Sequence, residues 1–135
     1  MNKLQKVLLV DDDDIVNSIN KVIIKHAKFA EEIIAETIAS SALDYIKGQK
    51  NEGTLPDLIF LDINMPEMDG WDFVDEYMKL GFEENGPRII MLTSSINPRD
   101  ENRASLIDEI TDFMSKPLSP EVLEKIYMEH FSSTS

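Results

Sequence analysis

Three short runs of apolar residues are the clearest pattern along the chain, and they span 7–10, 58–61 and 89–92. None of them alternates with polar residues, as a strand with one face in water does. Short uninterrupted apolar runs are typical of strands buried on both faces, which is the habit of parallel sheets. Two weaker strand candidates are 33–38 and 111–115. The pattern therefore predicts five strands.

The first two helices are predicted between these strands from periodicity and capping residues. The apolar side of the first is expected to consist of Ile15, Ile19, Val22 and Ile23. Aspartates stand in front of it and can cap its first turn. Ser41 opens a capping-box pattern that ends at Asp44 and predicts a second helix running toward Gly48.

Three further helices follow from similar signals. Asp69 can cap the third, and Gly81 suits its end. The fourth is expected from near Pro98 to Ile107. Ser119 followed by a proline is a strong start for the fifth. The apolar side of that helix consists of Val122, Leu123, Ile126, Tyr127 and Phe131.

The order of elements is therefore a strand followed by a helix, repeated five times. Right-handed crossovers then place helices on both faces of a five-stranded parallel sheet, so the fold class is α/β and doubly wound. The length of 135 residues suits one domain spanning 1–135, with a small polar tail at 132–135 that we expect to be frayed.

The composition narrows the possible partners. The 13 basic and 26 acidic side chains give a net charge of −13, which argues against direct binding to nucleic acid. Solubility explains such a charge, and so does the convergence of a few carboxylates on a cation. The absence of cysteine excludes thiolate metal sites and cysteine nucleophiles. No apolar run approaches the ~20 residues of a membrane span and no signal peptide is evident, so a cytoplasmic protein without membrane contact is expected.

Chemically active side chains stand where the predicted strands end. In a parallel sheet the carboxyl ends of the strands meet at one edge, where such proteins bind ligands. The residues that follow or close the strands there are 11–14, Asp62, Thr93, Ser94 and Lys116. Converging carboxylates repel one another and favour a hard cation such as Mg²⁺. An aspartate beside that ion can attack phosphorus, and the hydroxyl of Thr93 and the ammonium of Lys116 can stabilise the phosphoryl oxygens.

Four blocks of sequence resemble the receiver domain of two-component response regulators. They are 7–12, 56–70, 91–94 and 115–117. The stretch from residue 61, Leu-Asp-Ile-Asn-Met-Pro-Glu-Met-Asp-Gly, is very specific, and the four blocks occur in the family's order. The resemblance covers nearly the whole chain and implies the flavodoxin-like strand order 2-1-3-4-5.

The resemblance implies that this domain is a signalling switch, not an enzyme in the ordinary sense. Asp62 would accept a phosphoryl group from a phosphohistidine on a histidine kinase or a phosphotransfer protein. Asp11 and Asp12, together with Asp62 and the backbone carbonyl of Asn64, would hold Mg²⁺ or Mn²⁺.

The remaining roles implied by the resemblance concern signal output. Thr93 would be the switch hydroxyl, Lys116 the lysine that binds the phosphoryl group, and Pro117 a cis-proline. Phe113 occupies the aromatic switch position and lacks the hydroxyl of the tyrosine found in many relatives. The fourth and fifth helices would form the surface for a downstream protein or for a homodimer.

The run of four aspartates makes the register of the acidic pair ambiguous by one residue. Asp11 and Asp12 are chosen because the apolar run ends at Val10, which leaves Asp13 or Asp14 where the helix needs a cap. Elsewhere in the chain, His26 and His130 are expected to be exposed on helices.

The alternative function is a phosphatase of the haloacid-dehalogenase type. The sequence after the first strand nearly matches that family's D-x-D signature, with Asp11 as nucleophile and Asp13 as acid/base. That mechanism needs another acidic pair after the lysine, whereas the glutamates there fall on a predicted amphipathic helix: Glu121, Glu124 and Glu129. It also leaves the motif around Asp62 unexplained.

Overall fold

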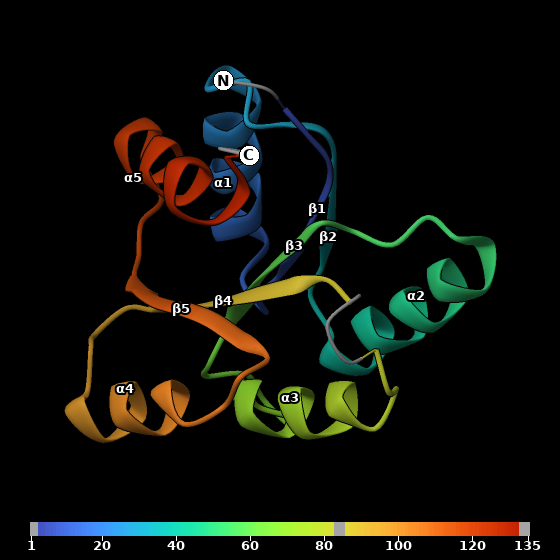
Figure 1. The fold of residues 1–135 in the computed structure, drawn as a ribbon. Helices are drawn as coiled ribbons and strands as arrows, with labels where there is room; N and C mark the ends of the chain where they lie inside the picture. The colour runs from blue at the N-terminus through green and yellow to red at the C-terminus, as the bar shows by residue number, and fades with distance from the viewer. Residues whose placement is uncertain (1–2, 83–85, 133–135) are drawn as a thin grey trace.

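Five parallel strands form one sheet in the order β2-β1-β3-β4-β5 (Figure 1). The computed structural model describes residues 3–82 and 86–132. The strands are β1 (Leu4–Val10), β2 (Ala30–Glu36), β3 (Leu58–Asp62), β4 (Arg88–Thr93) and β5 (Ile110–Ser115). This order confirms the expected flavodoxin-like α/β fold. The predicted frayed tail lies, apart from Ser132, outside the described residues.

Helices cover both faces of the sheet (Figure 1). They are α1 (Asp14–His26), α2 (Ala39–Glu52), α3 (Gly70–Met78), α4 (Pro98–Ser105) and α5 (Pro120–Ile126), and α5 continues into a π-helical turn, η1 (Tyr127–Phe131). α1 and α5 lie on one face, and α2, α3 and α4 lie on the other. No helix in the described part of the chain is both long enough and apolar enough to cross a membrane.

The central strands contribute to two separate cores, one under each layer of helices. Leu8 and Ile59 point toward α2, α3 and α4, whereas Val7 and Leu58 point toward α1 and α5. Successive strand residues point to opposite faces, so both faces of each central strand need apolar side chains. This explains why the three apolar runs are continuous, as the sequence predicted.

Three helices begin where a capping side chain was expected. The Asp13 carboxylate accepts a hydrogen bond from the backbone N–H of Ile15 at 2.9 Å, and the Ser119 hydroxyl accepts one from Val122 at 3.1 Å. Asp69 forms a capping box at the start of α3. Such caps satisfy N–H groups that have no partner within the helix, which fixes the first residue of each helix.

The expected capping box at Ser41 is wrong. α2 begins three residues earlier, with Ile38 in place of Ser41 at the N-cap, and Ile38 provides no side-chain cap. The helix also continues through Gly48 to Glu52, and Gly53, whose φ of 75° suits a glycine, caps its end. The burial of Ala39 against the sheet decides where this helix begins. β2 likewise begins at Ala30, which pairs with Leu4 of β1.

The predicted apolar face of α1 is wrong at three of its four residues, and the fourth, Ile23, is partly buried against the core. Ile15, Ile19 and Val22 are exposed by 70%, 50% and 68%, whereas Asn17 and Asn20 are buried. The Nδ2 group of Asn17 donates to the backbone carbonyl of Asp11 at 2.9 Å. The buried side of the helix thus consists of Asn17, Asn20 and Ile24, and most of the predicted apolar stripe faces solvent.

Candidate functional site

The ends of four strands bring the predicted site residues to one edge of the sheet. Asp11 follows β1, Asp62 and Thr93 close β3 and β4, and Lys116 follows β5. In the β3–β4 ladder Asp62 is paired with Leu92, the residue before Thr93. Because all strands run in the same direction, their carboxyl ends bring side chains far apart in sequence to one place.

Three carboxylates converge at this edge. Asp11, Asp12 and Asp62 each present an oxygen, and these oxygens lie within 4.8 Å of one another. Asp11 and Asp62 are buried, with 5% and 6% of their surface exposed, whereas Asp12 is exposed. Asp11 also accepts the backbone N–H of Asp13 at 2.9 Å. With Asp13 engaged as the helix cap, the first two aspartates of the run belong to the acidic cluster.

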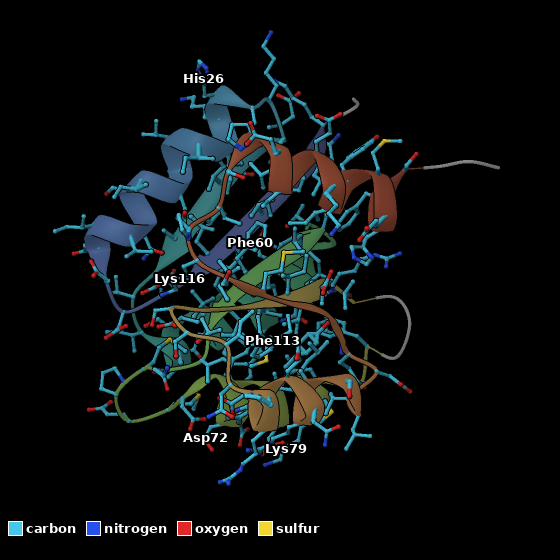
Figure 2. The ribbon with its side chains drawn as sticks, turned by 90° about the vertical axis from the view of Figure 1, so that its left-hand side faces the viewer. His26, Phe60, Asp72, Lys79, Phe113 and Lys116 are labelled. Carbon is cyan, nitrogen blue, oxygen red and sulfur yellow. The ribbon has the colours of Figure 1, made fainter. Side chains whose placement is uncertain are left out.

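Lys116 is the cation that faces this cluster, and it lies near the start of α1 (Figure 2). Its Nζ lies 2.6 Å from Asp11 Oδ2 and 3.2 Å from Asp62 Oδ1. One ammonium offsets one of three carboxylate charges, so the cluster keeps an excess of negative charge. A hard divalent cation, which prefers carboxylate oxygens, would balance it.

The electrostatics of the cluster perturb both partners of the ion pair. Burial, with the charge of Asp11 added to it, raises the pKa of Asp62 from 3.8 to about 6, against the opposing effects of Lys116 and the Asn64 backbone. Burial by itself lowers the pKa of Lys116, but the hydrogen bond that Lys116 donates to Asp11 and the charges of both aspartates outweigh it and raise that pKa. Ionising Asp62 is therefore costly until positive charge is added.

Two residues support the cluster from behind, and their structural roles were not predicted, although the second belongs to the motif around Asp62. Asn17 holds the carbonyl of Asp11, as described above. Gly70 lies so close to the end of β3 that an added Cβ would stand 2.8 Å from the carbonyl oxygen of Asp62. An asparagine among apolar helix positions is the sequence signal for the first. A glycine at the first position of a helix is the signal for the second.

The other predicted residues lie around the cluster, and one of them, Asn64, contacts it through a backbone hydrogen bond to Asp62. The hydroxyl of Thr93 donates to the carbonyl of Ser95 at 3.0 Å. Phe113 lies between the sheet and α4 (Figure 2), beside a cavity of about 210 Å³. The backbone N–H of Asn64 lowers the pKa of Asp62, and the Lys116–Pro117 peptide bond is cis.

This arrangement suits phosphoryl chemistry. The carboxylate of Asp62 is available as a nucleophile, and two further carboxylates can share a divalent cation with it. The ammonium of Lys116 contacts the carboxylates of Asp11 and Asp62. Neutralising the charge on phosphoryl oxygens is the main task in such a transfer.

Comparisons with known proteins agree on one family. The model described as the response regulator receiver domain matches residues 7–128. A two-component response regulator from Cytophaga hutchinsonii has a similar solved structure, with a TM-score of 0.89, 35% identity and coverage of 95% of this chain and 97% of that one. A receiver domain protein from Methanospirillum hungatei is 32% identical with a TM-score of 0.70, covering 90% of this chain and 89% of that one.

Curated relatives match over part of their length. The sensor histidine kinase CheAY of Helicobacter pylori is 34% identical over 88 residues, which is 65% of this chain and 11% of that protein. A protein-glutamate methylesterase/protein-glutamine glutaminase of Ralstonia nicotianae is 33% identical over 87% of this chain and 29% of its own length. The chain thus spans a minor part of these relatives.

Proposed function

The chain belongs to the family of response regulator receiver domains, which are signalling switches of two-component phosphorelays, and we propose that Asp62 is the residue that accepts the phosphoryl group. The observation that carries the proposal is the position of Asp62, which is buried at the end of β3 and lies beside Asp11 and the ammonium of Lys116. The donor would be a phosphohistidine on a histidine kinase or a phosphotransfer protein.

The proposed transfer exchanges one bond for another. An oxygen of Asp62 attacks phosphorus, the P–N bond to the donor imidazole breaks, and the imidazole leaves with the electron pair and takes up a proton. Lys116 already lies 3.2 Å from Asp62, so its ammonium is placed to meet an oxygen of the incoming group. The fold holds the Asp62 carboxylate and the Lys116 ammonium close together, and this proximity favours the step more than the basicity of any side chain does.

We further propose that Mg²⁺ or Mn²⁺ is the cofactor. Three carboxylates with oxygens inside 4.8 Å, faced by one ammonium among the residues that the structure describes, support this, because oxygen-only ligands select hard cations. Asp11, Asp12, Asp62 and the backbone carbonyl of Asn64 would hold the ion, and the bound ion would supply charge neutralisation for the phosphoryl oxygens. Residues 1–135 would act as one such domain.

Labelling with acetyl phosphate and Mg²⁺ tests the acceptor. We expect intact-mass spectrometry to find one acid-labile phosphoryl group on the wild type and none on Asp62→Asn, because the nucleophilic oxygen is lost. Asp75→Asn, on an exposed part of α3, is the matched control and should be labelled as fully as the wild type. Labelling of Asp62→Asn together with its loss in Asp11→Asn would refute the proposal and support the phosphatase mechanism.

Output is proposed to run from Thr93 to the surface of β5 and α4. The Thr93 hydroxyl donates to the carbonyl of Ser95, and the cavity of about 210 Å³ beside Phe113 is lined by residues of α4 and β5. A phosphoryl group offers acceptor oxygens that compete for that hydroxyl. Movement of the Thr93 loop would then let Phe113 shift within the cavity.

Hydrogen exchange with beryllofluoride, a mimic of the phosphoryl group, measures this coupling. We expect the mimic to change protection across residues 93–131 in the wild type and to leave them nearly unchanged in Thr93→Ala. Ser94→Ala, which alters an exposed neighbour, should behave as the wild type does. Equal changes in wild type and Thr93→Ala would show that Thr93 does not couple the two sites.

The exposed stripe of α1 supports a donor protein approaching from this side. Ile15 follows the aspartate run directly, so a partner that delivers phosphorus to Asp62 would cover it. A homodimer or a downstream partner would instead use α4 and α5, the helices before and after the strand that carries Phe113.

A further inference from the structure

A second group of metal-ligating side chains lies apart from the pocket of Asp62. It consists of Asp112 on β5 and of Glu129 and His130 in the π-helical turn η1. One possible ligand atom of each lies within 4.8 Å of the others. Asp112 lies three residues before Ser115, the last residue of β5. The group is therefore separate from the strand ends that form the pocket around Asp62.

The geometry points to a site for Zn²⁺ or a similar borderline divalent metal, and we propose that Asp112, Glu129 and His130 bind it. His130 Nε2 lies 3.2 Å from Asp112 Oδ2 and 3.8 Å from Glu129 Oε2. Two ligands bound tetrahedrally to Zn²⁺ at about 2.0–2.2 Å stand roughly 3.3–3.6 Å apart. Both separations therefore need to change by only a few tenths of an ångström.

The carboxylate of Asp112 is held in the orientation that such a site needs. Its Oδ1 accepts the backbone N–H of Phe113 at 2.8 Å, which leaves Oδ2 directed at His130. Ligating carboxylates in metal sites are typically fixed by a hydrogen bond of this kind. A register shift between β4 and β5 lies just before Asp112, and bulges of this sort re-aim side chains.

The turn that carries the other two ligands is also fixed in place. The backbone N–H of Ser132 donates to the carbonyl of Tyr127 at 2.7 Å and closes η1. The Arg88 guanidinium stacks over the Phe131 ring, with 5.2 Å from Cζ to the ring centroid. The side chain of His130 is only 19% exposed, so the imidazole is held against β5 and does not move freely in water.

The ligand chemistry separates this site from the pocket of Asp62. An imidazole with two carboxylates suits Zn²⁺, Ni²⁺ or Cu²⁺, whereas oxygen ligands alone suit Mg²⁺. Three protein ligands also leave a coordination position for water or for a group from a partner. The inference goes beyond phosphorylation and does not depend on it, since none of these residues contributes to the acidic cluster.

The two histidines of the chain provide an internal comparison for the test. His26 ends α1, on the exposed surface and far from Lys116 (Figure 2), and stands outside the proposed site. With millimolar Mg²⁺ present to occupy the acidic cluster, Zn²⁺ is titrated into the full chain, and the imidazole resonances are followed by NMR. We expect the His130 resonances to shift and saturate at one Zn²⁺ per chain, while those of His26 stay in place.

Variants assign the ligands. We expect His130→Gln to weaken Zn²⁺ binding by more than the roughly 10–100-fold that loss of an outer-shell partner costs. Glu129→Gln should weaken it less, and Glu124→Gln, on the exposed side of α5, should bind Zn²⁺ as the wild type does. Equal shifts of both histidines, undiminished binding by His130→Gln, or a His130 ring that does not respond to Zn²⁺ would overturn the proposal and leave an ordinary hydrogen bond between His130 and Asp112.

Discussion

Replacing Lys116 by methionine is expected to destabilise the metal-free domain by about 2–4 kcal/mol at pH 7. Lys116 Nζ stands 2.6 Å from Asp11 and 3.2 Å from Asp62, and both aspartates are buried. Removing the ammonium leaves two buried carboxylates facing each other without a counter-charge. The loss is limited because Asp62 can take up a proton, which costs less than remaining charged.

Urea denaturation in the presence of a chelator measures the effect. Lys79→Met is the matched control, since Lys79 forms a surface ion pair with Glu76 in which both side chains are well exposed. Such pairs contribute about 0–1 kcal/mol. Millimolar Mg²⁺ should restore part of the stability that Lys116→Met loses. If Lys116→Met and Lys79→Met are equally stable without metal, the pairing seen at the strand ends contributes nothing to folding.

The acidic cluster was predictable from the sequence because the carboxyl ends of parallel strands meet at one edge of the sheet. Apolar runs identify the strands, and the residue after each run must reach the same edge, so Asp11, Asp62 and Lys116 are brought together by topology. The register within the four aspartates followed from the same reasoning. Asp13 meets the need of α1 for a cap, which leaves Asp11 and Asp12 for the cluster.

The face of α1 was not predictable from apolar periodicity alone. The stripe through Ile15 and Ile19 follows a helical period, yet the buried side of the helix is the one that carries Asn17, Asn20 and Ile24. A periodic pattern indicates which residues share a face. It does not indicate whether that face meets the sheet or a partner protein.

The group around His130 was missed because it depends on packing between elements. Asp112 and His130 are 18 residues apart, and the first belongs to a strand and the second to a turn. The sequence predicted an exposed helical histidine, whereas α5 ends at Ile126 and the π-helical turn directs the imidazole toward β5. Neither the end of the helix nor the shift in the β4–β5 register has a short-range sequence signal.

Asp62→Asn is expected to stabilise the metal-free domain at pH 7 by about 1–2 kcal/mol. Burial and the neighbouring Asp11 raise the pKa of Asp62 to about 6, so the folded state binds this proton more tightly than the unfolded chain does. The shift of about two pKa units corresponds to roughly 3 kcal/mol, and partial exposure to solvent reduces it. An uncharged amide of the same shape avoids that cost.

The size of this effect depends on pH. Because the folded pKa is raised above 3.8, the wild type loses stability from this group as the pH rises through the window between about 4 and 6. The variant has no such titration, so the two proteins should be equally stable near pH 4 and should diverge up to pH 7. A stability difference that is constant across this range would exclude a raised pKa for Asp62.

Added Mg²⁺ should reverse the ranking of the two proteins. In the wild type the ion would sit among three carboxylates, and binding to the folded state alone raises the melting temperature by linkage. Asp62→Asn and Asp12→Asn each lack one of those ligands and should show a smaller rise. Asp75→Asn, on the exposed surface of α3, should respond as the wild type does.

The carboxylate of Asp62 would then weaken the metal-free fold and strengthen the metal-bound one, as expected where buried charge is kept for function rather than stability. A melting temperature of the wild type that Mg²⁺ leaves unchanged would refute the proposed metal site.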